Sequence, residues 1–142
     1  MTDRYILLVE DDLEDVEFAR LAFQEAGNAP ALEVARDGAD ALDFLLLRGP
    51  HAGRPPIPPV LVLLDLKLPK LGGLELLRRI REHPRLRSLA VIVLTSSQLE
   101  AEIAEARRLG VLLYSRKPQG REQFLELARH IHSLISSESA LP

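Results

Sequence analysis

Acidic residues stand where two apolar segments of this chain stop, and acids in such positions can take part in metal-dependent phosphate chemistry. Glu10 and Asp11 follow the apolar run at 5–9, and Asp65 follows the apolar run at 60–64. Two carboxylates about 4 Å apart repel each other by about 4 kcal/mol at an effective dielectric constant near 20. Such a group is tolerated when one acid is protonated or when a cation joins it. A set of oxygen ligands alone favours Mg²⁺, or Mn²⁺, over zinc.

A hydroxyl group and a lysine stand at the ends of two later apolar segments. Thr95 and Ser96 end the apolar run at 90–94, and Lys117 follows the run at 111–114. Taken singly, a hydroxyl at the end of a strand and a lysine on the surface are ordinary features. Together with the acids, they form a set that can bind a phosphoryl group and neutralise its charge.

The segments that carry these residues alternate with amphipathic stretches. Short apolar runs predict strands and a period of 3.6 residues predicts helices. The predicted strands lie near 5–9, 32–36, 60–64, 90–94 and 111–114, and the predicted helices near 13–26, 38–48, 74–82, 99–109 and 124–135. Because parallel neighbours need crossover connections, this alternation predicts an α/β fold with a doubly wound parallel sheet. Such sheets bind ligands beyond the carboxyl ends of their strands, where all of these polar residues stand.

Helix capping is the main alternative explanation for the first group of acids. Asp12 directly precedes the helix that begins at Leu13, and Asp15 lies in the first turn of that helix, where carboxylates are favourable. Capping accounts for Asp12, but it accounts for neither Asp65 nor Lys117. The combination therefore indicates a site at this edge of the sheet.

The composition limits the class of protein. A chain of 142 residues fits one domain, with a core expected at about 4–135 and a frayed tail at 136–142. The net charge of -3 predicts no general attraction to nucleic acid or to an anionic membrane, and the lack of cysteine excludes thiol chemistry. No apolar run approaches the roughly 18 residues that span a bilayer, and the first residues do not form a signal peptide. We therefore expect a cytoplasmic protein.

Four motifs, in their order along the chain, resemble those of the receiver domains of two-component response regulators. They are Val9-Glu10-Asp11-Asp12, Leu63-Leu64-Asp65-Leu66-Lys67-Leu68-Pro69 with Gly72-Gly73, Leu94-Thr95-Ser96, and Tyr114-Ser115-Arg116-Lys117-Pro118. Each motif alone is weak, but the set covers nearly the whole chain and is highly specific. The resemblance implies a flavodoxin-like (βα)5 fold with strand order 2-1-3-4-5.

The resemblance also implies a role for each acidic residue. Asp65 would be the phosphoacceptor, attacking a phosphohistidine of a sensor histidine kinase. Mg²⁺, or Mn²⁺, would be held by Glu10 through water and directly by Asp11, Asp65 and the backbone carbonyl of Lys67. The chain would not be a turnover enzyme, although it would catalyse its own Mg-dependent phosphorylation and dephosphorylation.

Further residues are implied in phosphate binding and switching. Thr95, the amide of Ser96 and Lys117 would bind phosphate oxygens. Tyr114 would then rotate into space that Thr95 vacates, and this would change the surface of the fourth helix, the fifth strand and the fifth helix. The family pattern also predicts a cis bond before Pro118.

Two features depart from the usual receiver pattern. Lys67 places a flexible cation two residues after Asp65, where it would change the lifetime of the phosphoryl group in a direction that the sequence does not decide. The proline-rich segment at 49–59 is longer than the usual connection at that place. Together with the motif from Val9 to Val16 and the absence of an output domain, this segment resembles the stand-alone regulators that serve phytochrome-like sensor kinases. We expect such a kinase as the partner. We also expect a homodimer, since a lone receiver needs another way to pass on its signal.

Two other functions compete with this interpretation. A pseudo-receiver is a binding module that keeps the fold and does not use phosphorylation, but such modules usually lack an acid or the lysine, and this sequence keeps them all. An aspartate-nucleophile phosphatase carries Asp-x-Asp after its first strand, whereas Asp65 follows the third strand and Lys67 occupies the second acidic position. No Walker-type glycine-rich loop is present, so the sequence does not support nucleotide hydrolysis.

Overall fold

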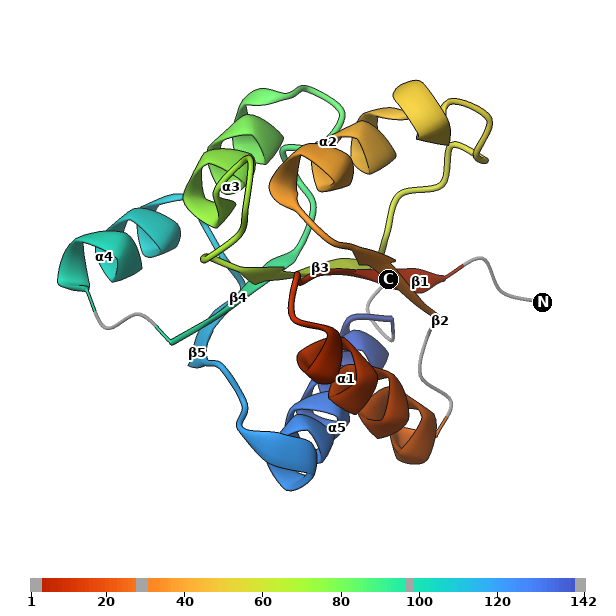
Figure 1. The fold of residues 1–142 in the computed structure, drawn as a ribbon, viewed down its shortest axis with the longest axis vertical. Coiled ribbons are helices and arrows are strands. Elements are labelled where there is room, and N and C mark those ends of the chain that lie inside the picture. Colours follow the sequence, from red (N-terminus) through yellow and green to blue (C-terminus); the bar gives the residue numbers. More distant parts are fainter. Residues whose placement is uncertain (1–3, 28–30, 97–98, 140–142) are drawn as a thin grey trace.

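The computed structural model describes residues 4–27, 31–96 and 99–139. Its five strands form one parallel sheet in the order β2-β1-β3-β4-β5, which confirms the predicted fold class and strand order (Figure 1). The strands are β1 (Tyr5–Val9), β2 (Ala31–Ala35), β3 (Leu61–Asp65), β4 (Val91–Thr95) and β5 (Leu113–Arg116). The helices are α1 (Leu13–Ala26), α2 (Gly38–Leu46), α3 (Gly73–Glu82), α4 (Glu100–Arg108) and α5 (Gly120–Ser139), with a short 3₁₀ helix, η1, at Gly49–His51.

Helices cover both faces of the sheet, with α1 and α5 on one side and α2, α3 and α4 on the other (Figure 1). Alternate residues of each central strand face opposite layers: in β1, Leu7 and Val9 pack towards α2 and α3, whereas Ile6 and Leu8 pack towards α1 and α5. A strand buried on both faces needs apolar residues throughout, which explains the continuous apolar runs in the sequence.

Capping side chains set the starts of the first two helices. Oδ1 of Asp12 accepts hydrogen bonds from the backbone N–H groups of Glu14 (2.9 Å) and Asp15 (3.1 Å), and Oδ1 of Asp37 accepts one from Asp40 (2.7 Å). These bonds satisfy donors that the first turn of a helix otherwise leaves open. The predicted capping role of Asp12 is therefore confirmed.

The predicted boundaries of the fifth strand and of the fifth helix are wrong. The fifth strand begins at Leu113 rather than at residue 111, because the turn after α4 includes Val111, whose N–H donates to the carbonyl of Ala106. Helix α5 begins at Gly120 and continues to Ser139, beyond the predicted range of 124–135 at both ends. Fraying of the tail from Ser136 stays a prediction. Ile135 is buried against the sheet and anchors this end of the helix, while residues 140–142 lie outside the described part of the chain.

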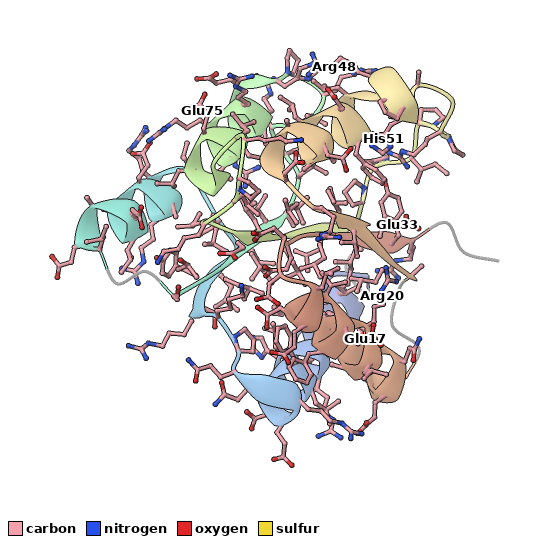
Figure 2. All side chains as sticks on the ribbon, viewed as in Figure 1. Glu17, Arg20, Glu33, Arg48, His51 and Glu75 are labelled. Atoms are coloured by element: carbon pink, nitrogen blue, oxygen red, sulfur yellow. The ribbon has the colours of Figure 1, made fainter. Side chains whose placement is uncertain are left out.

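The proline-rich segment at 49–59 is attached to α2 by polar contacts. Nε2 of His51 lies 2.8 Å from Oδ1 of Asp40. The guanidinium of Arg54 stacks on the ring of Phe44 at 3.3 Å, and its Nη2 donates to the Phe44 carbonyl at 2.9 Å. Figure 2 shows His51 beside α2. Within the described residues, no helix is long and apolar enough to cross a membrane.

Candidate functional site

The carboxyl ends of β1 and β3 bring three acids together. Val9 pairs with Leu64 in the parallel ladder, so the residues that follow them, Glu10 and Asp65, leave the sheet side by side. Glu10 and Asp65 are buried, whereas Asp11 is exposed. One carboxylate oxygen from each of the three acids lies within 4.8 Å of the others. This point, where the strand order reverses, is the expected place for a ligand in an open α/β sheet.

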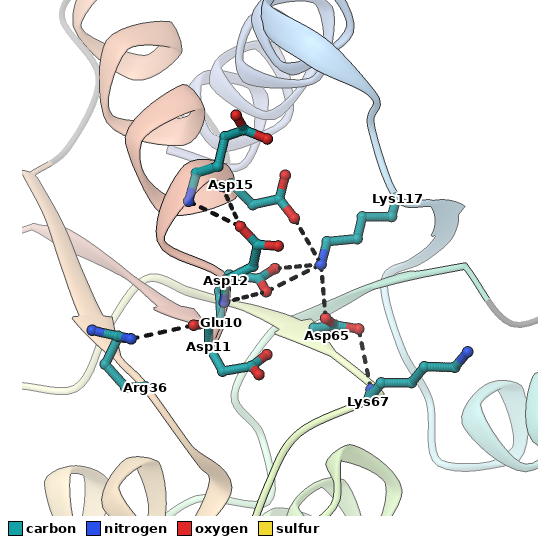
Figure 3. Close-up of polar contacts among 9 residues, drawn as sticks. Glu10, Asp11, Asp12, Asp15, Arg36, Asp65, Lys67 and Lys117 are labelled. Atoms are coloured by element: carbon teal, nitrogen blue, oxygen red, sulfur yellow. Dashed lines mark hydrogen bonds and ion pairs between the residues drawn. The ribbon is translucent and has the colours of Figure 1, made fainter.

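Lys117 reaches two of these acids, Glu10 and Asp65, from the far side of β4 (Figure 3). Its Nζ lies 3.0 Å from Oε1 of Glu10, 3.0 Å from Oδ2 of Asp65 and 2.9 Å from Oδ2 of Asp15. The backbone N–H of Lys117 donates to the carbonyl of Thr95 at 2.9 Å, which fixes where the side chain begins. The ammonium group therefore neutralises part of the acidic charge.

Backbone donors orient the two buried carboxylates. The N–H of Asp12 donates to Oε2 of Glu10 at 3.1 Å, and the N–H of Lys67 donates to Oδ1 of Asp65 at 3.1 Å. The second oxygen of Asp65 thus faces Lys117, while the first faces the chain that leaves β3. The amine of Lys67 is exposed and extends away from Asp65 (Figure 3).

Burial and charge act in opposite directions on the ionisable groups of the site. Burial raises the pKa of Glu10 to about 7. The hydrogen bonds from Lys117 and from the Asp12 amide favour the ionised form and lower this pKa, but burial has the larger effect. Burial lowers the pKa of Lys117, but hydrogen bonds to Asp15, Asp65 and Glu10 outweigh it and leave that pKa raised. Lys117 is therefore a permanent cation at neutral pH. A second cation would stabilise Glu10 in its charged form.

The predicted phosphate-binding hydroxyl lies next to this cluster. Thr95 is buried and Ser96 is exposed, and both line an open cavity of about 440 Å³ beside Lys117. Phe18 and Pro118 form part of the apolar wall of the cavity. The structure thus leaves room for a small anionic group in front of the lysine.

Tyr114 lies on β5 opposite Val93 and packs against the apolar cluster between the sheet and α3. Its hydroxyl is buried and has no hydrogen-bond partner among the described residues. Burial also raises the pKa of this hydroxyl. The half-buried ring therefore packs against this cluster, and its role in switching stays a prediction.

The predicted cis bond before Pro118 is wrong for this structure. All peptide bonds between the described residues are trans, including the bond from Lys117 to Pro118. The trans isomer is the more stable one at an X–Pro bond by about 0.5–1 kcal/mol. The long lysine side chain reaches the acids from this trans bond.

Asp15 is the site residue that the sequence did not reveal. Its place in the first turn of α1 has a sufficient explanation in helix electrostatics, and that explanation concealed its contact with Lys117. The available signal was its position three residues after the cap Asp12, in a first helical turn that begins just beyond the end of β1.

A family model of the response regulator receiver domain matches residues 6–129. The chain belongs to this family. The response regulator Rcp1 of Synechocystis sp. is 32% identical over 139 residues, which are 98% of this chain and 93% of Rcp1. The solved Mn²⁺-bound form of Rcp1 has a TM-score of 0.86, with 98% of this chain and 99% of that chain covered.

Two further similar structures are those of phytochrome response regulators. The bacteriophytochrome response regulator RtBRR is 41% identical, with a TM-score of 0.76 over 89% of this chain and 77% of that chain. The phosphorylated cyanobacterial phytochrome response regulator RcpA is 31% identical, with a TM-score of 0.88 over 99% of both chains. The predicted resemblance to receivers and to this group of regulators is therefore confirmed.

Family membership establishes the general class of the protein. A response regulator receiver domain is a component of two-component signalling and not a classical turnover enzyme. The three clustered carboxylates fit a divalent cation, because hard cations prefer oxygen ligands and a charge of +2 relieves the repulsion between the acids. Mg²⁺ and Mn²⁺ both take such a donor set.

Proposed function

We propose that the chain accepts a phosphoryl group from a sensor histidine kinase on Asp65, in a reaction that requires Mg²⁺. The observation that carries the proposal is the position of the Asp65 carboxylate. It is buried at the end of β3, within 4.8 Å of oxygens of two other acids and 3.0 Å from the ammonium of Lys117. A carboxylate in this place has a cation on one side and a divalent-cation site on the other.

In the proposed transfer, a carboxylate oxygen of Asp65 forms a bond to phosphorus. The bond from phosphorus to the imidazole nitrogen of the kinase breaks, and its electron pair leaves with the imidazole, which then takes a proton from water. Phosphoryl transfer depends mainly on positioning and on neutralisation of the phosphoryl oxygens. Lys117 supplies one positive charge, and the hydroxyl of Thr95 and the amide of Ser96 supply hydrogen bonds.

Four groups would hold the cation: Glu10 through water, and the carboxylates of Asp11 and Asp65 with the backbone carbonyl of Lys67. When bound, Mg²⁺ supplies positive charge to the phosphoryl oxygens. Of the three carboxylates, Asp11 is the exposed one, so it is the first of them that an incoming cation meets.

Signalling follows in this proposal as a shift between two populations. Hydrogen bonding to the phosphoryl group draws Thr95 inward, Tyr114 follows into the vacated space, and the surface formed by α4, β5 and α5 changes. The half-buried ring and the unpaired hydroxyl of Tyr114 support this part, because a buried hydroxyl without a partner gains free energy when it moves to one.

The proposed kinase is phytochrome-like, and the proposed assembly is a homodimer in the cytoplasm. The likeness to RtBRR and RcpA supports the choice of kinase. Phosphotransfer from each histidine kinase of the source organism, followed over short times, tests that choice. Sedimentation with and without a phosphate mimic tests the dimer, and a monomer in both states contradicts it.

Acetyl phosphate and Mg²⁺ test the phosphoacceptor role directly. Intact-protein mass spectrometry should show the addition of one phosphoryl group to the wild-type protein and none to Asp65→Asn. Asp43→Asn is the matched control, since Asp43 pairs with Arg48 on the surface of α2, and it should be modified like the wild type. Chelation of Mg²⁺ should abolish the modification. An unmodified wild-type protein would instead support the pseudo-receiver alternative.

A further inference from the structure

Lys117 has a third acidic partner, Asp15, that does not belong to the carboxylate cluster. Oδ2 of Asp15 lies 2.9 Å from Nζ of Lys117, and its side chain is only 19% exposed. Figure 3 shows Asp15 pointing from the start of α1 towards the lysine, on the side opposite Asp65. The ammonium group is thus held between Asp15 at the start of α1 and Asp65 at the end of β3.

The three partners of Lys117 differ in what happens to them during phosphoryl transfer. Asp65 becomes the acyl phosphate, and Glu10 contributes to the cation site, so both must change their contacts with the lysine. Asp15 lies outside the cluster of Glu10, Asp11 and Asp65. It is the partner that can keep its bond to Lys117 before, during and after the transfer.

The first turn of α1 is built to hold Asp15 in place. The Asp12 cap bonds to the backbone N–H of Asp15 at 3.1 Å, and Glu10 in turn accepts a bond from the N–H of Asp12 at 3.1 Å. The next residue, Val16, is buried in the layer between the sheet and α5. Both ends of the Asp15 backbone are therefore fixed, and its carboxylate can act as a rigid support.

We propose that Asp15 is a positioning residue, which holds the ammonium of Lys117 where it meets the phosphoryl group. This inference depends on the proposed phosphoacceptor function of Asp65. Without Asp15, Lys117 bonds only to the two acids that change during the reaction. The lysine then samples more orientations, and fewer of them neutralise the phosphoryl oxygens.

Glu14 provides a control for the general effect of charge. It lies next to Asp15 in the same helical turn and lines the same cavity, but it is not among the acids that bind Lys117. Glu14→Gln and Asp15→Asn should have similar effects on the rate if these acids act only by stabilising the helix N-terminus or by repelling an anionic phosphodonor. A positioning role is specific to Asp15.

The experiment measures the rate of modification by acetyl phosphate at saturating Mg²⁺. Asp15→Asn should lower the rate about tenfold, the size expected for loss of a hydrogen bond to a charged group, while Glu14→Gln should change it less than about twofold. Asp15→Ala should lower the rate at least as much as Asp15→Asn. Circular dichroism establishes that each variant is folded at the temperature of the assay.

A double-mutant cycle with Lys117→Gln identifies the route of the effect. If Asp15 acts through the lysine, Asp15→Asn should change the residual rate of Lys117→Gln less than about twofold. Equal rates for Asp15→Asn and Glu14→Gln, or an unchanged tenfold effect in the Lys117→Gln background, would overturn the role of Asp15. A wild-type protein that takes up no phosphoryl group would overturn the phosphoacceptor function itself, and the two failures are thus distinguishable.

Discussion

Nζ of Lys117 lies 3.0 Å from Oδ2 of Asp65, although β3 and β5 are separated by β4 in the sheet. The lysine side chain crosses the end of β4 to make this contact (Figure 3). An ammonium group therefore stands against the carboxylates that we expect to bind a divalent cation. The ammonium of Lys117 and the expected divalent cation would therefore both act on Glu10 and Asp65.

This contact predicts that Lys117→Gln binds Mg²⁺ more tightly than the wild type. Removal of a positive charge a few ångströms from the cation site removes a repulsion, and the acids that it neutralised become available. We expect the affinity to rise about tenfold in isothermal titration calorimetry. Lys70→Gln is the matched control, since that lysine is exposed and pairs with Asp37 at 3.5 Å. Weaker binding of Mg²⁺ by Lys117→Gln would contradict the prediction.

Gly73 allows the start of α3 to approach the end of β3. An added Cβ would lie 2.5 Å from the carbonyl oxygen of Asp65 and 2.5 Å from Cα of Leu66, so Gly73→Ala must displace the backbone beside the proposed phosphoacceptor. We expect a loss of about 2–3 kcal/mol in the free energy of unfolding and slower phosphorylation. Urea denaturation and the acetyl phosphate assay measure the two effects.

The neighbouring glycine is the control for this substitution. A Cβ added at Gly72 has no atom within 4 Å, and Gly72 has the extended backbone of a helix N-cap. Gly72→Ala should cost less than about 1 kcal/mol and leave the phosphorylation rate unchanged. Equal effects of the two substitutions would show that the close approach does not matter.

Arg81 connects α3 to the segments that follow α3 and α4. Its guanidinium donates hydrogen bonds to the carbonyls of Arg87, Leu89, Leu109 and Gly110. Lysine cannot reproduce the planar arrangement of donors, so Arg81→Lys should leave carbonyls unsatisfied and destabilise the fold by about 2 kcal/mol. Urea denaturation measures this, and Arg129→Lys, on an exposed position of α5, should be neutral. A neutral Arg81→Lys would show that water replaces these bonds.

Glu105 on α4 should make the stability of the fold depend on pH at the acid end. Hydrogen bonds from Arg108 and from Arg78 on α3 lower the pKa of Glu105 to about 2. A lowered pKa in the folded state means that the contribution of Glu105 is complete above its ordinary pKa of 4.5 and is lost as the pH falls through about 2.

Glu105→Gln should therefore be less stable than the wild type at pH 7 and at pH 5, and the difference should shrink between about pH 4.5 and 2. Urea denaturation at a series of pH values measures this difference. Glu126→Gln, on the exposed side of α5, should show a difference that does not vary with pH. If the difference in stability between Glu105→Gln and the wild type did not vary with pH, the arginine contacts of Glu105 would not persist in solution.

Much of this protein is readable from the order of its residues. The apolar runs before Glu10, Asp65 and Thr95 have the length and continuity of strands buried on both faces, and each ends in a polar residue. Because parallel strands present their carboxyl ends at one edge, the meeting of these residues with Lys117 follows from the alternation of strands and helices.

Features that depend on the packing of distant elements could not be predicted from the sequence. The contact of Asp15 with Lys117 joins the first turn of α1 to the end of β5, and it depends on the packing of α1 and α5 against one face of the sheet. The trans bond before Pro118 and the extension of α5 to Ser139 were not predicted either. Periodicity and capping act over a few residues, whereas the contact of Asp15 with Lys117 is set by packing between segments about a hundred residues apart.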